Sequence, residues 1–292
     1  MYELISLTEH DHYIDCPAKI GVVRISDSDV VLIDSGSDKD AAKKVLKVLT
    51  ANNWKLTAIY NTHSHADHIG GNRFLQEKTG CKIYAPGLEC AFTNHPELEP
   101  MGLYGGLPFS ALKHKFLLAQ ESTALPLTND CLPEGWQLLN LPGHSFDMAG
   151  FVTKDGTAFI ADCVSSEETL NKYGIGYLWD AGKSLETLSA VKSIGAKRVV
   201  PSHATVTEDI SSLADLNIRS IREVINRLLA FCKEPIAFDE LLKKVFDSYA
   251  LTMTAQQYVL IGSTVRSYLS YLCDAGKVTY EFTDNKMYWK AV

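Results

Sequence analysis

The sequence has no excess of positive charge, no cysteine pair of the C-x-x-C type and no long apolar segment. Its net charge of -7 argues against a general nucleic-acid or anionic-membrane binder. Seven scattered cysteines, an odd number, predict reduced thiols instead of a disulfide framework. The first residues lack the basic start and apolar stretch of an export signal, and nothing is long enough to span a bilayer. We therefore expect a cytoplasmic protein with no membrane partner.

Histidine is concentrated in the stretch NTHSHADHIGGN, where His63, His65 and His68 flank Asp67. Side chains two residues apart on an α-helix point to nearly opposite sides. His63 and His65 can therefore meet one metal ion only where the chain is extended or looped. Because histidine is the commonest metal ligand, this density favours a metal site over a polar loop.

The segments around this stretch predict a strand-to-helix turn. LTAIYNT before it is largely apolar and predicts a buried strand, while NRFLQEKTG after it predicts a helix that ends at Gly80. Gly70 and Gly71 allow the backbone to turn tightly between the two elements. The histidines are thus expected at the end of a strand.

The chain of 292 residues divides into two regions by pattern. Alternating strand and helix patterns predict an α/β layered core over residues 1–213, interrupted by a partly helical insertion at 88–130 that is rich in proline and glycine. We expect the insertion to cover the site or to form a dimer contact. Amphipathic helices followed by a terminal hairpin predict a winged-helix-like domain over residues 214–292.

Three further polar residues stand where apolar strands end. His144 lies in LPGHS, Asp162 in FIADC and His203 in VVPSHA. Carboxylates mixed with neutral imidazoles suit a borderline divalent cation, and six or seven such groups are too many for one tetrahedral ion. Two metal ions per chain are therefore expected.

With HSHADH as an H-x-H-x-D-H motif and the later residues in matching order, the sequence resembles the metallo-β-lactamase superfamily over about residues 4–213. The resemblance implies an αββα sandwich with the site at one edge of two facing sheets. It also implies a first metal held by His63, His65 and His144, a second held by Asp67, His68 and His203, and a bridge through Asp162. Asp34, in LIDSG, matches an early strand-end aspartate expected to orient the ligands.

This ligand set predicts a metal-dependent hydrolase. Two cations that share a water would lower its pKa enough to give a bridging hydroxide near neutral pH, and Asp67 could orient that nucleophile. Zinc is expected, while the hard carboxylate of Asp162 leaves iron or manganese open. That carboxylate, together with the missing export signal, argues against an antibiotic-degrading β-lactamase. The substrate is expected to be a small molecule with an ester, thioester or phosphodiester bond.

Several narrower readings stay open. PGHS and the complete ligand set resemble glyoxalase II thioesterases, whereas the two-part layout resembles the lactamase-like endoribonucleases. Residues 215–292 carry ten lysine and arginine residues against nine acidic ones, which does not support nucleic-acid binding. The tail could instead pack against the catalytic domain or a second subunit, as in a homodimer. Persulfide dioxygenases, which carry a similar histidine stretch but use one iron, offer an oxidoreductase alternative. A regulator with a degenerate domain would lack ligands, and none is missing.

Aromatic residues in NKYGIGYLWDAG, downstream of the bridging aspartate, are candidates for a substrate pocket: Tyr173, Tyr177 and Trp179. They are equally suited to packing.

The remaining histidines and one cysteine are assigned no metal. EHDHY repeats the i, i+2 spacing with His10 and His12, but no glycine pair or helix start follows, so a surface loop is predicted. His95 and His114 are expected to be structural or exposed. Cys163 should point away from the metals into the core, because neighbouring strand residues face opposite ways.

Overall fold

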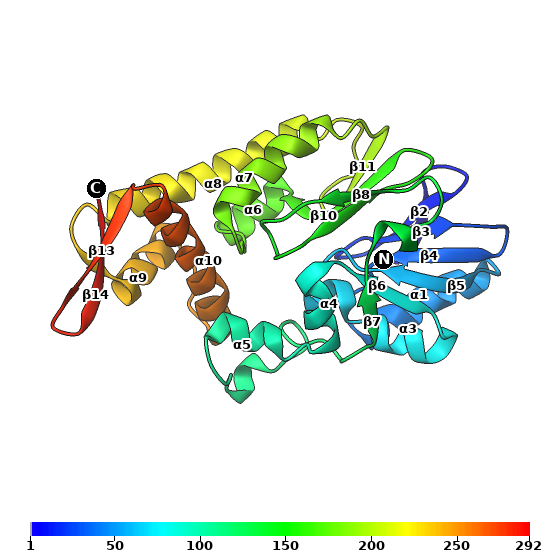
Figure 1. Cartoon of the computed structure of the whole chain (residues 1–292), viewed down its shortest axis with the longest axis horizontal. Coiled ribbons are helices and arrows are strands. Elements are labelled where there is room, and N and C mark those ends of the chain that lie inside the picture. The colour runs from blue at the N-terminus through cyan, green and yellow to red at the C-terminus, as the bar shows by residue number, and fades with distance from the viewer. Residues whose placement is uncertain (1) are drawn as a thin grey trace.

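The computed structural model of this chain describes residues 2–292, in which two β-sheets face each other (Figure 1). The first sheet runs in chain order: β1 (Glu3–Ser6), β2 (Asp11–Asp15), β3 (Ile20–Arg24), β4 (Asp29–Ile33), β5 (Lys55–Tyr60), β6 (Lys82–Ala85) and β7 (Ala124–Pro126). The second sheet has the order β11 (Arg198–His203), β10 (Thr157–Ser165), β9 (Ala149–Val152) and β8 (Gln137–Asn140).

Helices cover the outer faces of both sheets and fill the connections. Those between strands of the sandwich are α1 (Lys39–Ala51), α2 (Ala66–Ile69), α3 (Asn72–Thr79), α4 (Gly87–Asn94), α5 (Leu98–Tyr104), α6 (Glu167–Tyr173) and α7 (Ala181–Ala190). Short 3-10 turns are η1 (Ser110–Leu112), η2 (Asn129–Cys131) and η3 (Val191–Ser193). No helix within residues 2–292 is both long and apolar enough to cross a bilayer.

Three apolar clusters hold these layers together. Between the sheets, Val31 and Ile33 of β4 share a cluster with Phe151 of β9 and Phe159 of β10. A second cluster joins the first sheet to α1 and α3, and a third joins the second sheet to α7 and the C-terminal helices. Helix, sheet, sheet and helix therefore follow one another, which confirms the predicted αββα sandwich.

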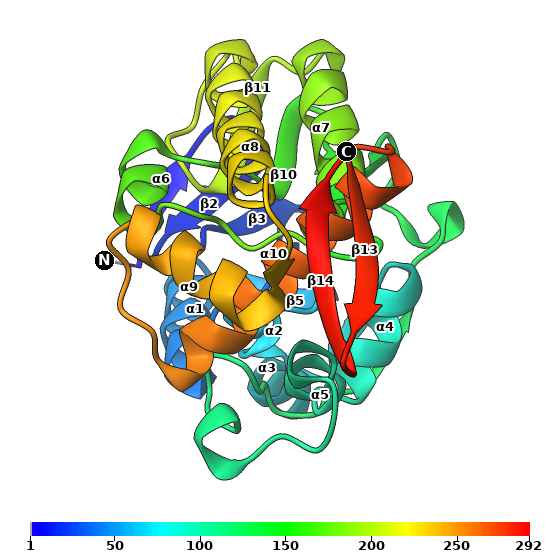
Figure 2. The same cartoon turned by 90° about the vertical axis from the view of Figure 1, so that its left-hand side faces the viewer.

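The C-terminal region consists of α8 (Ser211–Phe231), β12 (Ile236–Ala237), α9 (Phe238–Ser248), α10 (Ala255–Asp274), β13 (Val278–Thr283) and β14 (Lys286–Ala291). The last two strands form the predicted terminal hairpin, and β12 adds to it in the order β12-β14-β13. Figures 1 and 2 show α8 lying along α7, with the hairpin at the far end. Buried residues of α8, α9 and α10 share one apolar cluster with β10 and α7, so this region packs against the sandwich. A domain boundary at residue 213 stays a prediction, and α8 begins just before it, at Ser211.

The surface loop predicted for EHDHY is wrong for His12. This residue lies in β2, is 7% exposed, and places its ring 5.3 Å from that of Trp54. Its neighbour Asp11 is 1% exposed and accepts a hydrogen bond from Thr153. The sequence pattern did not reveal β2, because its polar residues Asp11 and His12 are buried by neighbours distant in the chain.

The glycine pair brings two loops into close contact. A Cβ on Gly70 would lie 2.2 Å from the Ser37 carbonyl oxygen, and one on Gly71 would lie 2.3 Å from the Ser35 oxygen. Only glycine permits this approach. The loop after β4 is thereby held against the strand-to-helix turn after β5, whose helix α3 ends at Gly80 as predicted.

Candidate metal centre

All seven predicted ligands converge at one edge of the two sheets, in two groups. Within each group the ligand atoms lie within 4.8 Å of one another. One group consists of His63, His65 and His144, and the other consists of Asp67, His68, Asp162 and His203. The structure thus reproduces the division that the family resemblance implied.

The three-histidine group has the spacing of a tetrahedral site. His65 Nδ1 lies 3.1 Å from His63 Nε2 and 3.1 Å from His144 Nε2. Two nitrogens that each lie about 2.0–2.1 Å from a tetrahedral zinc ion are roughly 3.4 Å apart. Both measured distances therefore lie within a few tenths of an ångström of the spacing that one such ion requires.

Asp162 lies between the two groups. Its Oδ1 is 3.1 Å from His68 Nε2, and its Oδ2 is 3.2 Å from His203 Nε2 and 3.6 Å from His144 Nε2. Asp67 Oδ2 completes the second group at 3.4 Å from His203 Nε2. One carboxylate is thus in reach of ligands from both groups, as a bridging ligand must be.

A hydrogen-bond chain sets which ring nitrogens face the centre. Asp34 Oδ2 accepts from His68 Nδ1 at 2.7 Å and from the Thr62 hydroxyl at 2.8 Å. Because that hydroxyl gives its only proton to Asp34, it accepts from His63 Nδ1, 3.0 Å away. In their neutral forms His63 and His68 then present the lone pairs of Nε2 to the centre, and Asp34 lies where it could orient the His68 ring.

The charges of the two groups also suit cations. Burial lowers the pKa of His65 and His144 to about 4, so both rings are neutral near pH 7 and can donate lone pairs. The Asp162 carboxylate instead raises the pKa of His203 to about 10. The second group therefore favours a positive charge among its members, which a divalent cation would supply.

Among the candidate ligands, two buried atoms lack a hydrogen bond within the described residues. They are His68 Nε2 and Asp162 Oδ1, which lie 3.1 Å from each other in the second group. Buried polar atoms in native proteins are almost always paired. A cation at this point would satisfy both atoms, so the residues present fit the metal that the fold implies.

Sequence reasoning missed Glu89, a fully buried residue of α4. Its carboxylate accepts from the backbone N–H and the hydroxyl of Ser64, and from the Ser145 hydroxyl and the Asp147 N–H. Ser64 stands within the H-x-H pair, and Ser145 directly follows the third histidine. One carboxylate from the insertion therefore ties together the two loops that carry the first group. A lone glutamate on a helix gives no sequence signal for this role.

We expect Glu89→Gln to weaken both the fold and the three-histidine group. Whichever way the amide is turned, its NH2 faces a backbone N–H, that of Ser64 or of Asp147, which cannot rotate to accept. Loss of such a buried acceptor costs about 1–3 kcal/mol. Chemical denaturation and metal analysis should show lower stability and lower metal content, whereas the exposed Glu121→Gln should change neither. Wild-type values for both in Glu89→Gln would contradict the assigned role.

The insertion also borders a cleft of about 180 Å³ in front of the centre. Phe116, Leu117 and Leu260 form its apolar walls, and Glu99 lies among them. Burial raises the pKa of Glu99 to about 8, and its Oε1 is 3.7 Å from His65 Nε2. Residues of the insertion therefore line the cleft, while the expected roles of the insertion as a cover or a dimer contact stay predictions.

The three aromatic residues predicted as pocket candidates lie in different places in the structure. Tyr177 places its ring 5.2 Å from that of His65 and lines the cleft. Tyr173 is 48% exposed at the end of α6. Trp179 is also 48% exposed, and its ring lies 4.4 Å from that of Phe146. Of the three, the structure brings Tyr177 to the candidate ligands.

The histidines assigned no metal lie outside both groups. His10 is exposed and pairs with Asp155 at 3.1 Å, His95 is exposed, and His114 is half-buried beside Phe116. Cys163 is packed against the core cluster of α7 and α8, as predicted.

Residues 13–203 match the family model of the metallo-beta-lactamase superfamily. The chain belongs to this superfamily. It is 27% identical over 167 residues to a hydroxyacylglutathione hydrolase of Methylococcus capsulatus, covering 53% of this chain and 51% of that protein. It is 44% identical over 151 residues to one of Rhodopseudomonas palustris, covering 50% and 48%. The chain thus spans about half the length of these relatives.

Comparison with solved structures extends the similarity in fold to nearly the whole of this chain. A beta-lactamase domain protein from Burkholderia ambifaria aligns with 99% of this chain and 94% of its own, with a TM-score of 0.77 and 15% sequence identity. The C-terminal helices and hairpin therefore belong to a fold that also occurs in another protein.

Proposed function

We propose that this chain is a metal-dependent hydrolase that holds two divalent cations and cleaves a carboxylic ester or thioester. The position of Asp162, within reach of ligands from both histidine groups, carries the proposal for two ions. When bound, the two cations would lower the pKa of a water and polarise the oxygen of the bond to be cleaved.

The residues of the chain account for the other requirements of hydrolysis. Asp67 is 43% exposed and lines the cleft, so its carboxylate can orient a water and accept its proton. Asp34 and Glu89 hold the ligand loops in place before substrate arrives. The apolar walls of the cleft restrict water to the reacting position. Zinc is the proposed metal, because imidazoles and carboxylates in a tetrahedral arrangement suit it.

The lining of the cleft favours an acyl substrate over a phosphodiester. No lysine or arginine is among its lining residues in the described chain, and phosphate recognition relies on such cations. The names of the relatives, hydroxyacylglutathione hydrolases, support acyl hydrolysis as well. An endoribonuclease activity has no comparable support. The three C-terminal helices with their hairpin are proposed as a winged-helix-like unit that serves the sandwich and not nucleic acid.

Metal analysis combined with a substrate screen tests this function. We expect two equivalents of zinc per chain and hydrolysis of thioesters or esters in a panel that also contains lactones, lactams and phosphodiesters. Cleavage of phosphodiesters alone would favour the endoribonuclease reading. One iron per chain without hydrolysis would refute the proposal and favour the persulfide dioxygenase reading.

A further inference from the structure

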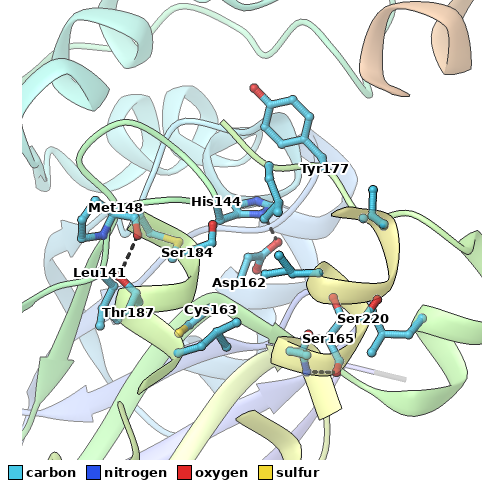
Figure 3. Close-up of a pocket in the computed structure, with 18 of the residues that line it drawn as sticks. Leu141, His144, Met148, Asp162, Cys163, Ser165, Tyr177, Ser184, Thr187 and Ser220 are labelled. Carbon is cyan, nitrogen blue, oxygen red and sulfur yellow. Dashed lines mark hydrogen bonds and ion pairs between the residues drawn. The ribbon is translucent and has the colours of Figure 1, made fainter. Parts of the chain in front are cut away.

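A cavity of about 50 Å³ lies behind the candidate metal centre, on the side of the C-terminal helices. His144, Asp162 and Tyr177 line this cavity, and the same three residues line the cleft in front of the centre. Figure 3 shows Asp162 and His144 at the middle of the cavity wall with Tyr177 above them. The cavity and the cleft therefore lie on two sides of the same candidate ligands.

The apolar part of the cavity lining comes partly from the C-terminal region. Ile221 and Val224 of α8 and Tyr268 of α10 line it together with Met148 and Leu188. All five residues are at least nine-tenths buried. The helices that follow the sandwich thus complete a space next to the reacting position, which gives them a role beyond packing.

Among the polar lining residues, Ser184 differs from its neighbours. Asn217 bonds to both backbone groups of Ser165, and the Thr187 hydroxyl donates to a backbone carbonyl. Ser184 is 5% exposed, and its hydroxyl has no hydrogen-bond partner in residues 2–292. Figure 3 places it beside His144 and Asp162. A buried hydroxyl without a partner indicates that a polar atom of a ligand is expected there.

We propose that this cavity is the acyl pocket of the enzyme and that it selects a short acyl group. The inference rests on the proposed function and names its substrate class. A single water needs about 10–15 Å³ of such space, so the cavity holds roughly four non-hydrogen atoms. The acyl carbonyl would lie at the metal centre with the chain in the cavity, and the leaving group would occupy the open cleft.

The reaction consumes one water for each acyl group. The water oxygen bonds to the acyl carbon, the bond from that carbon to sulfur or oxygen breaks, and the leaving thiol or alcohol takes up a proton. The products are a short carboxylic acid and the thiol or alcohol. Lining residues of the cavity include no lysine or arginine within the described chain, so a neutral acyl chain suits it better than an anionic one.

Chain-length preference tests the pocket. The zinc-loaded protein is assayed with acetyl and butanoyl thioesters of N-acetylcysteamine. The butanoyl group has two more methylenes than the acetyl group, and burying them in the cavity should raise kcat/KM about tenfold. The wild type should therefore prefer the butanoyl ester by that factor. Val224→Phe, which places a ring in the cavity, should abolish the preference by lowering kcat/KM for the butanoyl ester more than for the acetyl ester. Ser220→Leu, at the half-buried edge, tests the same point with less disturbance of the core.

Asn226→Phe, on the exposed face of the same helix, is the matched control and should keep the wild-type preference. If folded, zinc-loaded Val224→Phe and Ser220→Leu keep the wild-type preference, the proposal that this cavity binds the acyl group is wrong.

A second measurement separates this proposal from the hydrolase function. Butanoate binding to the zinc-loaded wild type and variants is followed by calorimetry. If no ester or thioester is cleaved, the proposed function fails, yet butanoate binding that is lost in Val224→Phe still supports the pocket. If esters are cleaved but butanoate binds wild type and Val224→Phe equally, the pocket fails and the function stands.

Discussion

Replacing Asp162 with alanine is expected to abolish turnover and to remove metal from the centre. This residue approaches ligands of both groups, at 3.1 Å from His68, 3.2 Å from His203 and 3.6 Å from His144. Its loss leaves the second group with one carboxylate and removes the link to the first. Loss of an outer hydrogen-bond partner costs about 10–100-fold in metal affinity, so the loss of a shared ligand should exceed about 100-fold.

Metal content by mass spectrometry and kcat on the best ester or thioester measure this effect. Asp27→Ala is a suitable control, because Asp27 is fully exposed in the turn between β3 and β4. That turn lies at the end of β4 opposite to the centre. Unchanged metal content and turnover in Asp162→Ala would count decisively against the assignment of the ligands.

Asp34→Asn is expected to lower metal affinity by about 10–100-fold, mainly at the second group. The carboxylate accepts from His68 and from the Thr62 hydroxyl through the same oxygen, and from the Thr62 N–H through the other. An asparagine that keeps the bond to the Thr62 N–H would turn its NH2 toward His68. The ring would then lose the acceptor that directs its Nε2 to the metal.

Asparagine is the informative substitution because Asp34 has a φ of 64°, a left-handed conformation that asparagine adopts more readily than alanine. Strain is thereby kept apart from the loss of the hydrogen bond. Asp29→Asn, at the opposite end of the same strand, is the matched control. Calorimetric titration with zinc should show weaker binding in Asp34→Asn alone. Equal affinities in the two variants would show that Asp34 does not orient His68.

The two predictions differ in what they remove. Asp162→Ala deletes an atom that would touch the metal, whereas Asp34→Asn leaves every ligand present and changes only how one is held. A much larger loss in the first variant than in the second would agree with these separate roles. Similar losses in both would indicate that the orientation of His68 limits metal binding as strongly as the shared carboxylate does.

Local sequence determined the elements on which the centre is built. Apolar runs predicted β4, β5, β10 and β11, because buried strands need continuous apolar faces. The i, i+2 spacing of His63 and His65 excluded a helix at that point, and the glycine pair predicted the turn that follows. Ligand residues stood out because they interrupt apolar strands at their ends, and their order along the chain identified the superfamily.

Tertiary structure alone decided which distant residues support the centre. Glu89 and Glu99 lie in the irregular insertion, where no periodic pattern marks a functional side chain, and only folding brings them to the histidines. The sequence pattern assigned His12 to a loop because the residue that its ring packs against, Trp54, lies 42 positions further along the chain, just before β5.

The proposed acyl pocket likewise combines burial that the sequence predicted with contacts that only the tertiary structure shows. Val224 and Tyr268 follow helical apolar patterns that sequence assigns to a core, and that assignment is correct. Local pattern shows that such residues are buried but not which others they face. Only the packing of α8 and α10 behind Asp162 leaves a space beside the metal centre. Sequence by itself therefore indicated the candidate ligands and the class of chemistry, because both follow from residue types and their order. The three-dimensional packing decided which residues support the candidate ligands and which spaces lie beside them, because contacts between distant residues form only on folding.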